Sequence, residues 1–303
     1  MILAVSFNTT EDISAAVPVF EHGAVLRTDQ ITSYPGGKAL NAARALSILG
    51  SKVFLTGICG SESLQRLENF CAQYGIKASM ETAQGSNRIC LIINESEKHS
   101  ETVINSESSF PAPGKPAALV LKKIQAQSKK SSFVLFSGSL PSGLPADFYA
   151  KAIEKISDRK KVMIDASSRY LFHAIKAGPG IVKINLKELE DAFSVNLKSM
   201  AKLEKFAALL SSKYKIWLFI VTLGESGAMI YSSGKHTYHP PCAVKNIVSP
   251  VGSGDAFAAG LLYGLSNNMG IAQSAKWANA AAAANLSSKG ACFFTKEDVL
   301  NYL

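Results

Sequence analysis

Short apolar runs alternate with longer helical patterns along most of the chain. Three such pairs follow one another: 53–59 then 62–74, 133–136 then 145–156, and 162–164 then 169–177. Further apolar runs lie at 181–184 and 216–222, as expected for strands covered on both faces, and helical patterns at 254–266 and 271–287 close the chain. The alternation predicts an α/β domain, doubly wound, with a mostly parallel central sheet and helices on both faces.

Two regions interrupt this alternation, at about 11–34 and 86–106. Strand-like segments at 88–93 and 101–105 follow each other without a helix between them. We expect these regions to pair as a small separate β-sheet. Open α/β sheets bind ligands at the carboxyl ends of their strands, so an inserted sheet of this kind is well placed to act as a lid. The sequence therefore predicts one domain over 1–303 with a small β lid.

Composition narrows the class of protein. The 303 residues are 47% hydrophobic and 18% charged, which is enough apolar material for one large core and excludes a disordered chain. The five cysteines are scattered without a C-x-x-C pair, so neither a zinc site nor a disulfide framework is indicated. Reduced thiols favour a cytoplasmic location. The apolar start lacks the basic leader of a signal peptide, and no run reaches the length of a membrane helix.

The formal net charge of +9 raises the question of nucleic acid. The lysine pairs at 122–123, 129–130 and 160–161 are dispersed and lack interleaved aromatic residues, so we expect no nucleic-acid partner. A general positive field favours small anionic substrates such as sugar phosphates and ATP.

The strongest local signal is Gly252-Ser253-Gly254-Asp255, where a glycine-rich turn leads directly into a helical pattern. Free N–H groups at a helix start bind anions, and glycines let the backbone approach a phosphate closely. Asp255 would lie beside this anion hole, placed to take a proton from an attacking hydroxyl. An isolated pattern of this kind is also typical of an aspartate that only stabilises a helix N-terminus.

A second glycine pair opens a helix earlier, at Gly36-Gly37-Lys38, followed by Asn41. A cation at a helix N-terminus opposes the helix dipole, so Lys38 is better explained if an anion such as a substrate phosphate also lies there. Asn41, one turn later, could bind a sugar hydroxyl. The alternative is a surface lysine followed by a packed helix.

No P-loop, dinucleotide fingerprint or G-x-S-x-G elbow occurs, which disfavours ordinary NTPases, dehydrogenases and serine hydrolases.

Together the two glycine motifs resemble the signatures of the ribokinase-like PfkB carbohydrate kinases. The chain resembles in particular the branch that holds 1-phosphofructokinase and tagatose-6-phosphate kinase, over almost its whole length. Intermediate segments agree with this: 137–141, Asp165 to Ser167, Asn185 to Glu188, and 222–227. The branch usually shows Thr-Glu-Ile-Asn in a lid strand, whereas this chain has Thr102-Val-Ile-Asn105 and so lacks that carboxylate.

The resemblance implies a set of site residues. Asp255 is implied to be the catalytic base, with Gly252, Ser253 and Gly254 as the anion hole. The implied sugar-phosphate pocket comprises Asp12, Gly37, Lys38, Asn41, Arg88 and Gly138. The implied nucleotide site comprises Lys183, Asn185, Thr222, Gly224, Gly227 and Asn279, with Glu188 organising Mg²⁺ through water. Simpler roles stay open for some of them, as a turn cap for Asp12, an exposed strand residue for Arg88, a solvated carboxylate for Glu188 and a packing residue for Asn279.

The resemblance thus implies a phosphotransferase that uses Mg²⁺ and ATP to phosphorylate an alcohol group of a sugar. Fructose 1-phosphate is the first expected acceptor and tagatose 6-phosphate the second. It also implies a homodimer formed through the lid. A reading from another class is a catalytically idle sensor of sugar phosphate or nucleotide, which the altered lid strand favours and the retained Gly252, Gly254 and Asp255 oppose.

Overall fold

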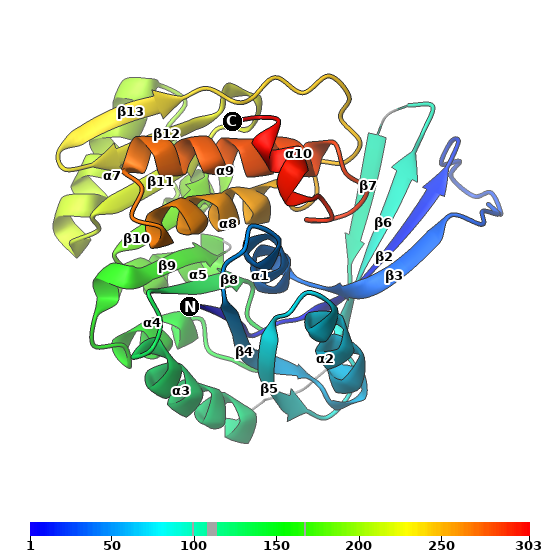
Figure 1. The fold of residues 1–303 in the computed structure, drawn as a ribbon, viewed down its shortest axis with the longest axis horizontal. Helices are drawn as coiled ribbons and strands as arrows, with labels where there is room; N and C mark the ends of the chain where they lie inside the picture. Colours follow the sequence, from blue (N-terminus) through cyan, green and yellow to red (C-terminus); the bar gives the residue numbers. More distant parts are fainter. Residues whose placement is uncertain (99, 108–113, 167) are drawn as a thin grey trace.

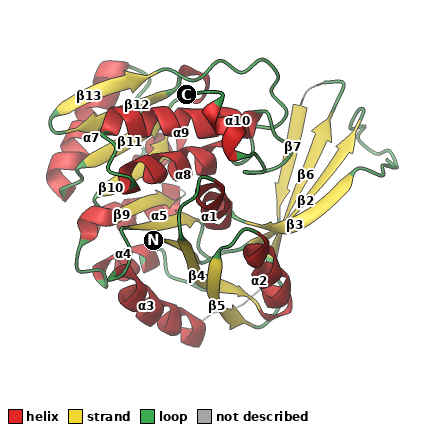
Figure 2. Ribbon diagram, viewed as in Figure 1, coloured by secondary structure: helices red, strands yellow, loops and turns green. Residues whose placement is uncertain are grey.

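The computed structural model describes residues 1–98, 100–107, 114–166 and 168–303, and its main element is a nine-stranded sheet. The strands are β1 (Ile2–Ser6), β4 (Val53–Gly60), β5 (Lys77–Ala83), β8 (Phe133–Gly138), β9 (Val162–Ala166), β10 (Ile181–Asn185), β11 (Leu218–Thr222), β12 (Ala228–Ser232) and β13 (Lys235–His239). Their order in space is β13-β12-β11-β10-β9-β8-β1-β4-β5 (Figures 1 and 2). All neighbouring strands from β5 to β11 in this order are parallel. Strand β12 runs antiparallel to β11, and β13 runs antiparallel to β12. The predicted mostly parallel sheet is confirmed.

Helices cover both faces of this sheet. One layer consists of α1 (Lys38–Ile48), α2 (Leu64–Gln73), α8 (Ser253–Ser266), α9 (Ile271–Leu286) and α10 (Lys296–Leu300). The other consists of α3 (Gly114–Ser128), α4 (Phe148–Glu154), α5 (Ser168–Lys176), α6 (Leu186–Phe193) and α7 (Met200–Tyr214). Because successive strand side chains point to opposite faces, Ile2 and Ala4 of β1 join the first core and Leu3 and Val5 the second. The prediction of helices on both faces is therefore confirmed.

A separate four-stranded sheet projects from one side of the main body (Figure 1). It consists of β3 (Ile31–Gly36), β2 (Thr10–Val17), β6 (Arg88–Glu95) and β7 (Ser100–Asn105), in that order. The central pair β2 and β6 is parallel, and each edge strand runs antiparallel to its neighbour. These strands come from the two regions that interrupt the sequence alternation, so the predicted small sheet is present.

The two faces of this small sheet differ in character. Asp12 lies opposite Cys90, which in turn pairs with Asn105, and this polar row shares its face with Tyr34, whose ring packs edge-on against Phe293 of the main body. The other face carries the apolar side chains of Ile13, Ile31, Ile89, Leu91 and Ile104. Three of these are largely exposed, with Ile31 at 58%, Ile89 at 45% and Ile104 at 53%. The polar face is thus the one turned toward the main domain.

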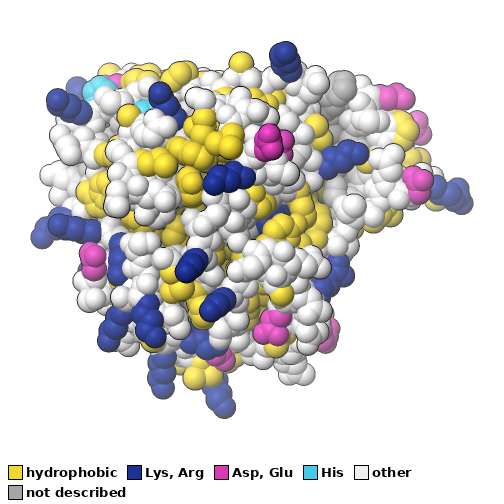
Figure 3. All heavy atoms as spheres, viewed as in Figure 1, with side chains coloured by type: hydrophobic (Ala, Val, Ile, Leu, Met, Phe, Trp, Pro, Cys, Tyr) yellow, Lys and Arg dark blue, Asp and Glu magenta, His cyan; other side chains and the backbone are white. Residues whose placement is uncertain are grey.

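The carboxyl ends of neighbouring strands in the large sheet lie at one edge. Gly138 ends β8, Asn185 ends β10 and Thr222 ends β11, while α1 and α8 begin close to the same edge. Open α/β sheets bind ligands at this edge. Lys and Arg side chains are spread over the face of the molecule seen in Figure 3, as the dispersed lysines of the sequence indicate. No helix among the described residues is long and apolar enough to cross a membrane.

Candidate active site

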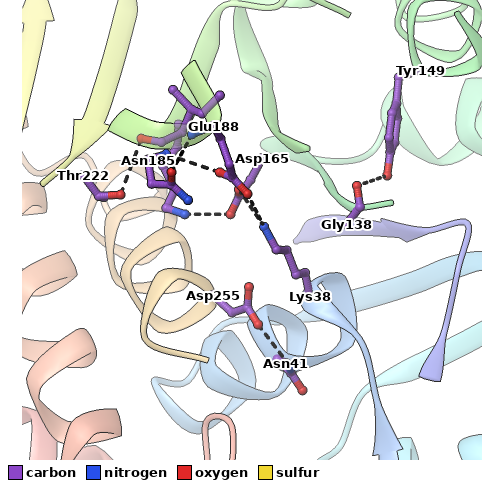
Figure 4. A network of polar contacts seen from close by, with 11 residues as sticks. Lys38, Asn41, Gly138, Tyr149, Asp165, Asn185, Glu188, Thr222 and Asp255 are labelled. Atoms are coloured by element: carbon purple, nitrogen blue, oxygen red, sulfur yellow. Dashed lines mark hydrogen bonds and ion pairs between the residues drawn. The ribbon is translucent and has the colours of Figure 1, made fainter. Parts of the chain in front are cut away.

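The carboxylate of Asp255 lies in the first turn of α8 and is only 5% exposed. Gly252 precedes the helix in the left-handed conformation, with φ of 85°, and so turns the chain sharply into it. Asn41 in α1 donates a hydrogen bond from Nδ2 to Asp255 Oδ2 at 3.0 Å (Figure 4). The other amide atom, Asn41 Oδ1, is buried and has no hydrogen-bond partner among the described residues. The site therefore presents a carboxylate and an unused acceptor side by side.

Steric crowding explains why glycines occupy this turn. A Cβ on Gly252 would lie 2.6 Å from the Cβ of Ala291, so a side chain cannot be placed there without a shift. A Cβ on Gly254 would lie 3.2 Å from Lys183 Nζ. The first N–H groups of a helix have no acceptor inside it, and here they border a lysine ammonium. The anion hole at Gly252, Ser253 and Gly254 stays a prediction, which the ammonium of Lys183 beside Gly254 favours.

Two lysines and two carboxylates lie next to this turn. Lys183 donates to Asp165 Oδ2 at 2.8 Å, and both side chains are nearly inaccessible to solvent. Lys38 Nζ lies 3.4 Å from Glu188 Oε1 and 3.8 Å from Asp165 Oδ1, and Figure 4 shows it pointing between these carboxylates and Asp255. The anions next to Lys38 are therefore the carboxylates of Glu188 and Asp165.

Burial dominates the electrostatics of Asp255. It raises the pKa of Asp255 from 3.8 to about 7, and the nearby charge of Asp165 acts in the same direction, while Lys38, the Asn41 hydrogen bond and Lys183 oppose it. Burial also disfavours a charge on Asp165, but Lys183 and Lys38 hold the pKa of that carboxyl below its usual range. Asp165 is therefore the fixed anion, whereas Asp255 can change its protonation near neutral pH.

Asn185 and Glu188 form a capping box at the start of α6. Asn185 Oδ1 accepts from the backbone N–H of Glu188 at 2.8 Å, and the Glu188 carboxylate accepts from the N–H of Asn185. This local bonding explains the N-x-x-E spacing and leaves Glu188 Oε1 facing Lys38. The described residues contain no group of three His, Cys, Asp or Glu side chains arranged to hold a metal ion. Asp165 and Glu188 do supply two carboxylates near one lysine.

The remaining predicted nucleotide residues lie along the same edge. Thr222 pairs with Asn185 across β10 and β11, and its hydroxyl donates to the carbonyl of Ile184 at 3.4 Å. Gly224 and Gly227 follow in a short 3-10 turn, both with positive φ. The turn packs against Pro240, whose carbonyl accepts from Asn279 Nδ2 at 2.8 Å. The structure thus places Asn185, Thr222, Gly224, Gly227 and Asn279 along one edge. The Asn279 side chain is hydrogen-bonded to a backbone carbonyl. Ser167 lies outside the described residues.

The predicted acceptor residues of the small sheet lie at its junction with α1. Asp12 packs directly against Gly36 and is hydrogen-bonded to the Thr10 hydroxyl. Burial raises the pKa of Asp12, an effect that the Thr10 bond and Arg88 partly offset. Arg88 donates to Asn105 Oδ1 at 2.8 Å, while its Nε has no partner among the described residues. Gly37 leads from this junction into α1, with φ of 106°.

Gly138 lies on the other side of Lys38. A Cβ on Gly138 would be 3.8 Å from the Lys38 Cβ, and the Gly138 carbonyl accepts from Tyr149 at 3.1 Å (Figure 4). Lys38 therefore lies between the predicted acceptor residues and the predicted nucleotide residues. Within the described residues no hydrogen bond or ion pair joins Arg88 to Asp255, and the Gly36–Asn41 segment connects the two parts of the site.

Sequence reasoning missed several residues of this region. Asp165 belongs to a matching segment, but its ion pairs with two lysines give no signal in the sequence. Glu101 on β7 accepts from Ser249 Oγ, just before the glycine turn, at 2.7 Å. The alternation of strand side chains could have indicated it, because Glu101, Val103 and Asn105 share one face. The lid strand thus keeps a carboxylate toward the site, two positions before the expected one.

The chain matches the model of the pfkB family carbohydrate kinases over residues 2–298. This chain belongs to the pfkB family. It is a carbohydrate kinase, a phosphotransferase whose family uses ATP. The predicted family is thereby confirmed, and the short motifs at Gly36–Asn41 and Gly252–Asp255 are the parts of the chain that indicate it from sequence.

Solved structures share the family fold at low sequence identity. Phosphofructokinase-2 from Escherichia coli, in a structure described as the tetrameric inhibited form, is 21% identical over 99% of this chain and 97% of that chain, with a TM-score of 0.88. A protein from Thermotoga maritima named a possible 1-phosphofructokinase is 21% identical over 99% and 96%, also at 0.88. Arabidopsis thaliana ribokinase complexed with ribose and ATP is 16% identical over 99% and 97%, at 0.78. The pfkB fold is therefore shown independently of the family match.

Asp255→Asn should stabilise the folded protein at alkaline pH. The pKa of Asp255 is about 7 in the folded state against an ordinary 3.8, so the unfolded chain loses this proton at lower pH. Folding therefore becomes less favourable as pH rises from about 4 to 7. One pKa unit corresponds to about 1.4 kcal/mol, so the neutral variant should be more stable than the parent by roughly 2–4 kcal/mol at about pH 8.

Urea unfolding at about pH 4 and pH 8 measures this difference. The variant and the parent should agree at the lower pH, where Asp255 is protonated in the folded state. Asp191→Asn, at an exposed position of α6, is the matched control and should show no such pH-dependent gain. Equal stabilities of Asp255→Asn and the parent at about pH 8 would contradict the burial argument.

Proposed function

We propose that this kinase transfers the γ-phosphate of ATP to a hydroxyl of a ketohexose phosphate, with fructose 1-phosphate as the first acceptor and fructose 1,6-bisphosphate as its product. Tagatose 6-phosphate is the second candidate. The observation that carries the proposal is the buried Asp255 carboxylate at the glycine turn, next to the unpartnered Asn41 Oδ1. A hydroxyl bound there could donate its proton to Asp255 while its position is fixed by Asn41.

The chemistry requires an in-line displacement at the γ-phosphorus. The acceptor oxygen forms a bond to phosphorus, the bond to the β-phosphate oxygen breaks, and ADP leaves. Asp255 takes the hydroxyl proton and later releases it to solvent. A pKa of about 7 suits this role, because about half of the base is ionised at pH 7 and it is strong enough to accept a proton.

Charge on the transferring group is offset by the glycine turn and the two lysines. The N–H groups of Gly252 and Gly254 at the start of α8 would face the phosphoryl oxygens, with Lys183 next to Gly254, whereas the N–H of Ser253 donates to the carbonyl of Pro250 at 3.2 Å. Lys38, held between Asp165 and Glu188, would lie between donor and acceptor. These groups are positioned before substrate arrives, so little reorganisation is needed during transfer.

A phosphate on the acceptor is supported by Arg88 and Lys38. Arg88 is partly buried, and its Nε has no partner among the described residues, which leaves a guanidinium donor for an anion. Asp12, at 4% exposure, faces the same junction and would bind sugar hydroxyls. A neutral sugar would leave the Arg88 donor unsatisfied, so a phosphorylated acceptor is favoured.

Magnesium fits the carboxylates on the nucleotide side. Mg²⁺ prefers oxygen ligands and is commonly held by one or two carboxylates together with substrate phosphates and water. Asp165 and Glu188 offer such oxygens, and Glu188 would act through water. When bound, the ion would neutralise phosphate charge. Lys183, Asn185, Thr222, Gly224, Gly227 and Asn279 would border the nucleotide. The five free cysteines support a reducing compartment such as the cytoplasm.

The four-stranded sheet would act as a lid over the acceptor. Its polar face carries Asp12 and Arg88, and Glu101 bonds to Ser249 beside the glycine turn. Closure of the lid would exclude water that otherwise hydrolyses ATP. The small sheet and the large sheet belong, in this proposal, to one domain over 1–303.

The purified protein should release ADP from Mg-ATP in the presence of a phosphorylated ketose. We expect turnover with fructose 1-phosphate, or failing that with tagatose 6-phosphate, and less with fructose 6-phosphate, fructose or ribose. Asp255→Asn should lower kcat by about 10²- to 10⁴-fold, the usual contribution of a general base. A coupled assay for ADP measures both, and Asp191→Asn serves as the control at an exposed aspartate.

Two outcomes would count against this function. Full turnover in Asp255→Asn would show that Asp255 is not the catalytic base. Absence of turnover on every sugar, with thermal stabilisation by a sugar phosphate or ATP, would favour a sensor that binds these ligands without catalysis.

We further propose that two copies of the chain associate through the outer, apolar face of the lid. Ile31, Ile89 and Ile104 are exposed there on the same face as Ile13 and Leu91. An apolar face of this kind on both copies suits a two-fold interface, in which the same surface meets itself. Its rim carries Glu11, which already pairs with Arg66 at 2.8 Å, so little unpaired charge opposes association.

Ile104→Lys should convert a dimer into single chains. A lysine within an apolar two-fold contact introduces two like charges without partners, which opposes association. Light scattering gives the mass in solution. Leu209→Lys, at a position of α7 that is 60% exposed, is the control and should leave the dimer intact. A parent protein that is already a single chain, or an unaltered mass in Ile104→Lys, would contradict this interface.

A further inference from the structure

Asn285 is a fully buried amide in the last turn of α9, at 0% exposure. Its Nδ2 donates to the carbonyl of Val251 and to Ser253 Oγ, each at 2.9 Å. Its Oδ1 accepts from the backbone N–H of Cys292 at 2.6 Å. Two of these contacts reach the glycine turn and the third reaches Cys292, so the Asn285 amide joins the turn to the segment 291–292.

That segment lies directly against Gly252. A Cβ on Gly252 would lie within 2.7 Å of both Cα and Cβ of Ala291, so the glycine turn and residue 291 are in backbone contact. Cys292 has φ of 60°, a left-handed conformation that residues other than glycine adopt at a cost. The conformation of 291–292 therefore needs support from outside the segment.

Arg44 of α1 supplies this support. Its side chain is fully buried and donates from Nε to the carbonyl of Cys292 at 3.0 Å and from Nη2 to the carbonyl of Ala291. The guanidinium carbon lies 3.7 Å from the ring centroid of Phe293, and the rings of Tyr34, Phe70 and Tyr74 complete the surroundings. Among the described residues no carboxylate is within ion-pair distance of Arg44.

Burial of an arginine without a carboxylate partner costs free energy, so other contacts must compensate for the lost hydration. Cation–π contacts offset part of the desolvation, and the two hydrogen bonds fix two successive carbonyls. Helix α1 also carries Lys38 and Asn41, one to two turns before Arg44. A single helix thus holds the group that contacts Asp255 and the group that supports the segment next to the glycine turn.

We propose that Asn285 and Arg44 are positioning residues for phosphoryl transfer. Arg44 fixes residues 291–292, and Asn285 transmits that placement to the turn 251–254, in which the N–H groups of Gly252 and Gly254 would face the transferring phosphoryl. The proposal rests on the proposed function of that turn. It extends that function to two side chains that touch neither nucleotide nor acceptor.

Because these residues act on the turn and not on the acceptor pocket, their loss should lower kcat and leave the KM for the acceptor nearly unchanged. Displacement of a catalytic group by about 1 Å can cost about 10²-fold in rate, and loss of one anion-hole donor about 10²- to 10³-fold. We expect kcat to fall by about 10- to 100-fold in Asn285→Asp, which keeps the size and the acceptor oxygen but loses both donated bonds. Asn285→Leu should behave similarly.

Arg44→Lys should show the same pattern, because lysine keeps the charge but cannot hold two carbonyls in a fixed fork. If Arg44 acts through 291–292 and Asn285, the double variant Arg44→Lys/Asn285→Asp should lose much less than the product of the two single effects. The matched controls are Asn267→Asp, whose amide donates to a backbone carbonyl at the far end of α8, and Arg159→Lys, which donates to the Ala177 carbonyl. Both controls should keep the parent kcat.

Amide hydrogen exchange provides a readout that needs no substrate. Peptides covering 249–257 should exchange at least about 10-fold faster in Asn285→Asp than in the parent, while peptides from β4 stay unchanged. If the parent transfers phosphate to no acceptor, the proposed function fails, and exchange still tests whether Asn285 holds the turn. Asn285→Asp also serves where Arg44→Lys does not fold.

Parent-like exchange over 249–257 in Asn285→Asp would overturn the proposal. So would a fall in kcat that equals the fall seen in the controls, a rise in acceptor KM without a change in kcat, or fully additive effects in the double variant.

Discussion

Burial of the Asp255 carboxylate at the start of α8 is the constraint on which the rest of the site depends. An ionised carboxylate away from solvent is tolerated only if other groups compensate for it, and here Asn41, Lys38 and Lys183 do so from α1 and β10. The charges of the two lysines are in turn paired with the carboxylates of Asp165 and Glu188. The elements that meet at this edge of the sheet are therefore joined by one group of two lysines and three carboxylates, which also sets the pKa of Asp255.

The sequence indicates the parts of this site that are local. The glycine turns at 36–37 and 252–254, the N-x-x-E capping box and the βα alternation all depend on neighbouring residues, and each is present in the structure. The helices at 114–128 and 200–214 were not predicted, although both are regular. Contacts such as Asn285 with Val251 or Lys38 with Asp165 join residues far apart in the chain, and without the fold no spacing rule indicates them.

The small sheet and the glycine turn are also connected in a way that the sequence obscures. Comparison with the family pattern suggests a lost carboxylate at position 103, yet Glu101 on the same face reaches Ser249. Burial raises the pKa of Glu101, and the Ser249 hydrogen bond partly offsets this. The contact lies two residues before Val251, so movement of the small sheet and the geometry of the turn are physically linked.

The most direct test of this account is the pH dependence of kcat/KM, measured with the acceptor that gives turnover, from about pH 5.5 to 9. This quantity reports the ionisation of the free enzyme, which is the state described here. The account predicts a plateau at alkaline pH and a tenfold fall per pH unit below a midpoint near 7, with the midpoint displaced in Asp255→Glu. A profile that is flat to about pH 5.5, or a midpoint that Asp255→Glu leaves unmoved and that therefore belongs to the substrate phosphate, would contradict the assignment of Asp255 as the base.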